Sequence, residues 1–131
     1  MEYVQVNDDL YCKIYIDTES KVQFKDLVLL ISNFIHGEEE FANSYHNDFI
    51  EVDIRTNKEY DPCFRNNKKD GFLFFKYYLE VNAIINVEQK VFISQLKSLI
   101  DFLRLRGFRV VPSCDFEDEL NDGKPYTEFM K

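Results

Sequence analysis

The chain has 131 residues with a hydrophobic content of 45%, which is enough for one domain with its own core and excludes bulk disorder. Its formal net charge is −8, from 24 acidic and 16 basic side chains. This charge repels nucleic-acid phosphates and anionic membrane surfaces, and it attracts basic partners. An acidic composition also serves solubility, so the charge alone leaves both interpretations open.

Cysteine usage and the first residues indicate where the protein works. Cys12, Cys63 and Cys114 are an odd number at wide spacings, which argues against a disulfide framework and for the reduced thiols of a cytosol. The opening MEYVQVNDDL has no apolar signal-peptide region, and the longest apolar run, residues 27–31, is too short to cross a membrane. We therefore expect a soluble cytoplasmic protein without a membrane partner.

The first half of the chain predicts a strand, a helix and a second strand. Residues 1–9 could contribute a short edge strand through Tyr3 or Val4 and Val6. Residues 10–16 alternate as a strand does, and residues 17–20 supply caps and acids for a helix that Gly37 would end. Residues 38–48 are polar and are expected to be a loop, and residues 49–55 alternate again.

The strongest strand signal is GFLFFKYYLEV, residues 71–81, which follows a long charged connection over residues 56–70. Alternation divides it into two faces. The predicted core face carries Leu73, Phe75, Tyr77, Leu79 and Val81. The other face carries Phe72, Phe74, Lys76, Tyr78 and Glu80.

The remaining pattern completes a fold prediction. Asn86 could cap a helix over residues 87–106 that Gly107 ends, and residues 108–114 form a strand that Pro112 places at a sheet edge. The order strand, helix, strand, strand, helix, strand predicts an α+β single domain over residues 1–131. The predicted architecture is a ferredoxin-like split βαβ sandwich (βαββαβ), an antiparallel sheet with both helices on one face. Residues 115–131 remain outside this pattern as a C-terminal tail.

In that fold the sheet face away from the helices is bare unless something covers it. It would carry the aromatic side chains Tyr11, Tyr15, Phe72, Phe74 and Tyr78, with Lys13 and Lys76. RNA-binding sheets stack bases on such surfaces, but two lysines do not offset the acidic charge, so nucleic acid is not an expected partner. The N-terminal segment, the tail, a second copy of the chain or a protein partner could cover the face.

Motifs for catalysis or cofactor binding are absent. The sequence lacks GxSxG, HExxH, P-loop and GxGxxG patterns, and His36 and His46 are expected on the surface. We expect neither an enzyme nor a cofactor. An acidic segment does stand out, with carboxylates at Asp115, Glu117, Asp118 and Glu119. An EF-hand is excluded because Leu120 and Tyr126 occupy positions that require Gly and an acid, so no metal is expected. The segment is either a solvated turn or a docking patch for a basic partner.

The aromatic strand FLFFKYYLEV followed by a helix and by VVPSCDFEDEL is similar to small bacterial cytosolic proteins regarded as immunity proteins of polymorphic toxin systems. The resemblance covers about residues 71–120. It implies a non-catalytic protein that binds a cognate toxin domain, often a nuclease. It does not supply contact residues, so the aromatic residues and the four carboxylates named above are the expected binding set. Two alternatives remain, namely a structural or regulatory domain that dimerises through the aromatic face, and a small-ligand sensor that uses Lys13 and Lys76.

Overall fold

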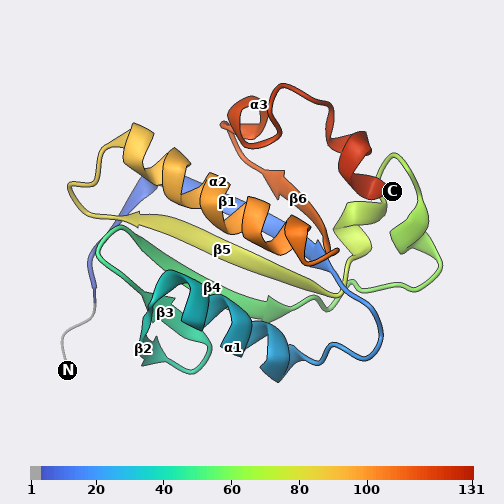
Figure 1. Ribbon diagram of the computed structural model, residues 1–131, viewed down its shortest axis with the longest axis horizontal. Coiled ribbons are helices and arrows are strands. Elements are labelled where there is room, and N and C mark those ends of the chain that lie inside the picture. Colours follow the sequence, from blue (N-terminus) through green and yellow to red (C-terminus); the bar gives the residue numbers. More distant parts are fainter. Residues whose placement is uncertain (1–3) are drawn as a thin grey trace.

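The computed structural model describes residues 4–131 and shows one six-stranded antiparallel sheet in the order β2-β3-β4-β5-β1-β6. The strands are β1 (Val6–Asp17), β2 (Glu38–Phe41), β3 (Ser44–His46), β4 (Ile50–Thr56), β5 (Tyr77–Ile84) and β6 (Arg109–Ser113). The helices are α1 (Phe24–Ile35), α2 (Gln89–Leu105) and the short α3 (Glu117–Leu120), with 3₁₀ turns η1 (Phe64–Asn66), η2 (Gly71–Phe74) and η3 (Tyr126–Met130). Both long helices lie on one face of the sheet, as predicted (Figure 1). The α+β class is confirmed.

The predicted ferredoxin-like arrangement is not confirmed, because the sheet has six strands where four were expected. The two added strands, β2 and β3, form a hairpin in residues 38–48, so the prediction of a loop there is wrong. Its acidic sequence, EEEF in β2, has little strand propensity. β2 is nevertheless the edge strand, where charged side chains protect the unpaired backbone from other chains.

The core lies between the sheet and the two long helices, and the predicted alternation builds it. The inward residues of β1 and β4 are buried as expected: Leu10, Cys12, Ile14, Ile16, Ile50, Val52 and Ile54. They pack against buried side chains of α1 and α2 such as Leu27, Ile31, Leu96 and Leu99. Each fully buried large aliphatic side chain contributes about 1.5–3 kcal/mol relative to exposure. Phe34 and Phe102 stack at 4.0 Å between ring centroids and join the two helices.

The strongest predicted strand is wrong in its first half. Gly71–Phe74 is the 3₁₀ turn η2, and β5 begins only at Tyr77. Gly71 packs directly on the preceding connection, where an added Cβ would come within 2.6 Å of the Arg65 carbonyl oxygen. The close approach bends the chain before the sheet. As a result Leu73, predicted in the core, is exposed, and Phe75 is buried on the opposite face of the sheet from the one predicted.

Helix ends differ from the prediction by a few residues. α1 begins after Gln23, whose backbone N–H donates to Asp26, and residues 17–20 do not cap it. The left-handed residue that ends α1 is His36 (φ 53°) and not Gly37. Glu88, and not Asn86, occupies the N-terminal cap position of α2, and Gly107 (φ 86°) follows the helix as predicted.

The C-terminal residues 115–131 pack on both faces of the sheet. Phe116 and Leu120, around α3, join the core beside α2. Met130, at the end of η3, packs with Tyr15 on the opposite face. The chain end therefore lies next to the η1–η2 segment (Figure 1), where the Tyr126 hydroxyl donates to the Lys69 carbonyl oxygen at 2.6 Å.

Two remaining predictions concern the N-terminal segment and membrane insertion. Tyr3 lies outside the described residues, whereas Val6 belongs to β1 and pairs with Ile84 of β5. Within residues 4–131, every helix is too short or too polar to cross a bilayer.

Candidate functional site

The sheet face that points away from α1 and α2 is called here the second face. The strand register arranges its side chains in three rows across β4, β5 and β1. From one end of the strands to the other, the rows are Arg55–Tyr78–Tyr15, Asp53–Glu80–Lys13 and Glu51–Asn82–Tyr11. Aromatic side chains therefore collect toward β1, and carboxylates collect toward β4.

The protein's own chain covers the aromatic corner of the second face. Tyr15 is only 9% exposed, because Phe72 of η2 packs edge-on against its ring at 5.4 Å and Met130 closes over it. Tyr126 in turn packs edge-on against Phe72 at 5.4 Å. Of the predicted binding residues, Tyr15 is thus buried and Phe72 is half-buried against the protein's own chain. The C-terminal tail therefore covers part of this face, which was one of the coverings that the sequence analysis left open.

The other predicted aromatic residues have different surroundings. Phe74 packs on Phe64 at 5.4 Å in the η1–η2 segment and does not lie on a strand. Tyr78 is half-buried on the second face, with the Lys13 ammonium 4.4 Å from its ring centroid. Tyr11 is 36% exposed. Tyr11 and Tyr78 are therefore the predicted anchors that a partner could still reach.

A group of carboxylates occupies the other half of the second face, and it is called here the carboxylate patch. Its members are Glu40, Glu51, Asp53 and Glu80. Glu40 comes from a register shift in β2 and is 8% exposed, with its carboxylate accepting from the Val4 backbone N–H. Sequence reasoning missed Glu40 because it assigned residues 38–48 to a loop. The three consecutive glutamates at residues 38–40 do not alternate with apolar residues, so no pattern marked Glu40 as the buried one.

The carboxylates repel one another. The pKa of Glu51 is raised from 4.5 to about 7 by burial, by a hydrogen bond with Glu40, and by the charges of Asp53 and Glu40. Glu40 Oε2 is buried and accepts no hydrogen bond within residues 4–131. Burial and the nearby Glu80 raise the pKa of Tyr11 to about 12. Negative charge on this face is therefore in excess over what the neighbouring cations neutralise.

Few cations stand beside the patch. Arg55 lies 3.7 Å from Asp53, between Nη2 and Oδ2, and Lys13 is opposite Glu80 across the strands. His46 Nδ1 lies 4.0 Å from Glu40 Oε2. The strands hold all these groups in fixed positions, so the patch is preorganised for a cationic partner.

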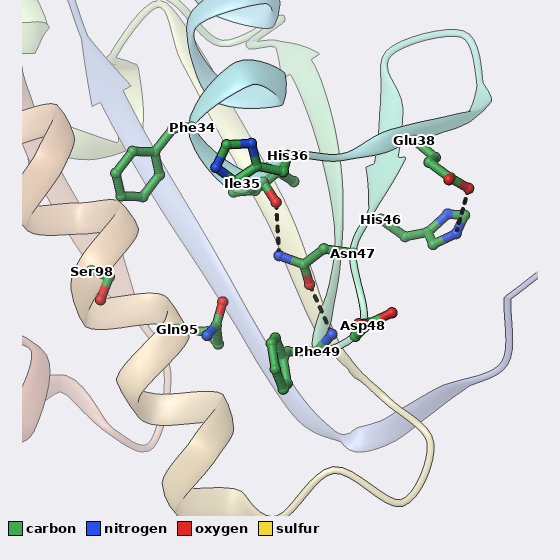
Figure 2. Close-up of a pocket in the computed structure, with 10 residues that line it drawn as sticks. All are labelled: Phe34, Ile35, His36, Glu38, His46, Asn47, Asp48, Phe49, Gln95 and Ser98. Atoms are coloured by element: carbon green, nitrogen blue, oxygen red, sulfur yellow. Dashed lines mark hydrogen bonds and ion pairs between the residues drawn. The ribbon is translucent and has the colours of Figure 1, made fainter.

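A hollow of about 500 Å³ lies between the ends of α1 and the β2–β3 hairpin on one side and α2 on the other. Figure 2 shows Asn47 at its centre, with its Nδ2 donating to the Ile35 carbonyl oxygen (3.1 Å) and its Oδ1 accepting from the Phe49 N–H (2.8 Å). His36 and His46, ten residues apart in the sequence, both line this hollow. His46 Nε2 lies 3.9 Å from Glu38 Oε2 on one side of the hollow. Gln95 and Ser98 line the opposite side from α2 (Figure 2).

The predicted acidic segment is exposed but lies elsewhere. Asp115, Glu117, Asp118 and Glu119 point to solvent around α3, which Phe116 and Leu120 anchor beside α2. Burial, Asp118 and Asp115 raise the pKa of Glu117. The segment lies beside α2 and β6, on the side of the sheet that the helices cover (Figure 1). It therefore does not form one surface with Tyr11 and Tyr78, which lie on the second face.

In residues 4–131 no three or more His, Cys, Asp or Glu side chains are grouped so that they could hold a metal ion. Comparisons of the chain with protein-family models, curated proteins and solved structures find no match.

Proposed function

We propose that this protein is a non-catalytic binding protein of the cytoplasm that captures and neutralises a basic toxin domain, such as a nuclease, as an immunity protein does. The observation that carries the proposal is the carboxylate patch, in which burial and the neighbouring Glu40 and Asp53 raise the pKa of Glu51 to about 7. The proposed contact surface is this patch together with Tyr11 and Tyr78, in place of the segment around Glu117.

The energetic argument rests on the repulsion within the patch. A lysine or arginine from a partner would favour the charged form of Glu51 and relieve its repulsion by Asp53 and Glu40. Strands fix these side chains before binding, so little ordering cost remains for the complex. The excess negative charge of the whole molecule, −8, adds long-range steering toward a basic partner.

Two tyrosine side chains, Tyr11 and Tyr78, lie beside the carboxylate patch. Tyrosine is enriched among the residues that dominate binding energy, because its large ring is buried at a low entropy cost. Tyr11 lies in the same row as Glu51, and Tyr78 lies in the row next to Asp53. The second face therefore combines apolar and acidic contacts within one surface.

The test is purification of the tagged protein from its native cell under toxin-producing conditions, followed by kinetics with the recovered partner. We expect a stoichiometric basic protein domain. The patch variant Glu51→Gln/Asp53→Asn/Glu80→Gln should associate about tenfold more slowly at low salt, with a smaller difference at high salt. The matched control Glu19→Gln/Glu59→Gln/Glu128→Gln replaces three carboxyl groups at exposed sites outside the carboxylate patch. Absence of a basic partner, or equal effects of the two variants, would refute the proposal.

A small-ligand sensor remains the second candidate, and the hollow beside Asn47 favours it. Aromatic rings of Phe34 and Phe49 with polar groups from Gln95 and Ser98 are the kind of lining that fixes a small molecule. A thermal-shift screen against metabolites tests this candidate. Dimerisation through the aromatic face has less support, since the tail covers Tyr15 and Phe72; sedimentation velocity measures it directly.

We also propose that β1, α1, β4, β5, α2 and β6 are a ferredoxin-like core to which the β2–β3 hairpin has been added. The order β4-β5-β1-β6 within the sheet supports this description. In it the hairpin extends the sheet beside β4 and supplies Glu40 to the patch.

A further inference from the structure

Cys12 lies on β1, and Cys114 is the residue that directly follows β6, the strand paired with β1. β1 and β6 pair in antiparallel register, with Lys13 opposite Ser113 and Ile14 opposite Pro112. Extending this register by one residue places Cys12 opposite Cys114. Both are free thiols, Cys12 belongs to the core between the sheet and the helices, and Cys114 packs against that core.

Pro112 indicates which kind of cross-strand pair the cysteines form. Proline has no backbone N–H to give to the ladder, so the Ile14–Pro112 pair is of the non-hydrogen-bonded type. The type alternates along an antiparallel ladder, so continuing it by one residue past Ser113, where β6 ends, would give Cys12 and Cys114 the same type. Such pairs hold their Cα atoms about 4.5 Å apart, within the range of about 4.4–6.8 Å that a disulfide spans.

The two thiols are not equivalent. Cys12 is wholly buried, whereas Cys114 is partly exposed. A hydrogen bond between them raises the pKa of Cys12 and lowers that of Cys114, and burial acts in the same direction on Cys12. The Phe116 backbone N–H also lowers the pKa of Cys114, against burial and the charges of Glu117 and Asp115. Cys114, the more exposed thiol with the lowered pKa, is therefore the one that loses its proton more readily, whereas the Cys12 thiol also donates to the Lys13 carbonyl oxygen at 3.6 Å.

We propose that Cys12 and Cys114 form a dithiol that closes reversibly to a cross-strand disulfide when the protein meets hydrogen peroxide. The Cys114 thiolate attacks one peroxide oxygen, the O–O bond breaks, and Cys114 becomes a sulfenic acid while hydroxide leaves. The Cys12 sulfur then attacks the Cys114 sulfur, its proton goes to the departing hydroxide, and water is released. Two thiols lose two electrons in total, and one peroxide is reduced to two waters. A small thiol reductant reverses the bond by exchange.

The position of this pair gives the disulfide a structural effect. Cys114 directly follows β6 and precedes Asp115 and α3. The bond would fix the edge strand β6 to the central strand β1 at the residue where the acidic segment begins. Cys63, exposed in the connection before η1, lies outside this pair and is an internal control.

The test treats the full chain with a slight excess of hydrogen peroxide, alkylates the unfolded protein with N-ethylmaleimide, and maps the peptides by mass spectrometry. We expect one alkylated cysteine, Cys63, where the reduced protein has three, and a peptide that joins Cys12 to Cys114. Dithiothreitol should restore all three. Three alkylated thiols after oxidation, a cross-link through Cys63, or an oxidised Cys114 beside a free Cys12 would each overturn the proposal.

Two variants test the order of events. Cys12→Ala removes the second thiol, so dimedone should label Cys114 as a lasting sulfenic acid. Cys63→Ala should still form the cross-link as the wild type does. No dimedone adduct on Cys114 in folded Cys12→Ala would contradict its role as the thiol that reacts first. If Cys12→Ala does not fold, the wild-type peptide map still decides the proposal.

Discussion

Glu51 links the charge of the second face to pH. Its carboxyl has a pKa of about 7 in the folded protein against 4.5 ordinarily. Glu40, Asp53 and His46 surround it from β2, β4 and β3. A carboxyl whose pKa is raised by folding binds more protons in the folded state, so its stabilising contribution is complete below about pH 4.5 and is lost as the pH rises through about 7.

We therefore predict that Glu51→Gln is more stable than the wild type at about pH 8 and close to it at about pH 5, because the neutral amide avoids the repulsion that appears on deprotonation. Urea unfolding at both pH values measures this difference. Glu59→Gln, on the exposed connection, is the control and should show no such pH dependence. A Glu51→Gln effect of equal size at both pH values would contradict the assignment.

Arg104 holds the C-terminal residues to the body of the protein. Its guanidinium donates to the carbonyl oxygens of Val110 and Leu120 and to Asn121 Oδ1, and it lies 3.4 Å from the Phe129 ring centroid. Burial lowers its pKa to about 10. These contacts join α2, β6, α3 and η3 through one side chain.

Arg104→Ala should lower the free energy of unfolding by about 3 kcal/mol, because it leaves several buried acceptors without a donor. Arg104→Lys should recover only part of this loss, since an ammonium lacks the planar fork that reaches them all. Arg106→Ala, two residues away and exposed, is the control and should cost about 0.5 kcal/mol or less. Chemical denaturation compares the three variants, and equal losses for Arg104→Ala and Arg106→Ala would contradict this role.

At the scale of elements, sequence periodicity correctly predicted the helices and strands that have one apolar and one polar face. α1, α2, β1 and β4 are amphipathic along their length, so their faces were visible in the sequence. β2 and η2 were not predicted, because each depends on a contact with a residue outside its own segment, and such a contact leaves no periodic pattern. Glu40 is held by Val4, and Gly71 packs on the Arg65 carbonyl.

The candidate site was predicted in part for the same reason. The alternation of β1 and β5 correctly placed Tyr11, Tyr15 and Tyr78 on the second face. Which of them stays accessible depends on η2 and η3, whose packing leaves no periodic signal. The covering of Tyr15 by Met130 could therefore be raised only as one alternative among several.

Met130 is the side chain through which η3 closes the aromatic corner. We predict that Met130→Ala lowers the free energy of unfolding by about 2–4 kcal/mol, since a buried methionine is removed and a cavity remains. It should also increase the fluorescence of a hydrophobic dye, because Tyr15 and Phe72 become accessible. Thr127→Ala, exposed in the same turn, should change neither measurement. An unchanged stability in Met130→Ala would show that η3 is not held by this contact.

The proposed Cys12–Cys114 bond joins strands that lie far apart in the sequence. Closing a loop of about 100 residues removes conformational freedom from the unfolded chain and stabilises the folded protein by about 4–5 kcal/mol where the native geometry is unstrained. The oxidised protein should therefore unfold at a higher urea concentration than the reduced one. A lower midpoint for the oxidised protein would show that the bond strains the β1–β6 ladder.

At the scale of the whole molecule, two acidic surfaces compete for a basic partner, namely the carboxylate patch and the segment at α3. Glu117→Lys/Asp118→Lys/Glu119→Lys changes the local charge from −3 to +3. If the patch is the contact, this reversal should slow association only through long-range steering, and the effect should fade beyond a Debye length of about 8 Å at physiological salt.

Tyr78→Ala completes the comparison by stopped-flow kinetics. It should act mainly on dissociation and depend little on salt, because it removes an apolar anchor. The contact would instead lie at α3 if, at high salt, the charge reversal of residues 117–119 weakened binding more than the carboxylate-patch variant does.

The order of strands in the sheet also governs how the chain reaches its fold. β1 is the first strand made, yet its two neighbours, β5 and β6, come from the second half of the sequence. Such distant pairings require large loops to close before any contact is gained, which places folding on a timescale of about milliseconds to seconds. Until then β1 exposes both hydrogen-bonding edges and an aromatic face to other nascent chains. A strand that is made first but gains both of its neighbours last is, during synthesis, the strand most in need of protection from aggregation.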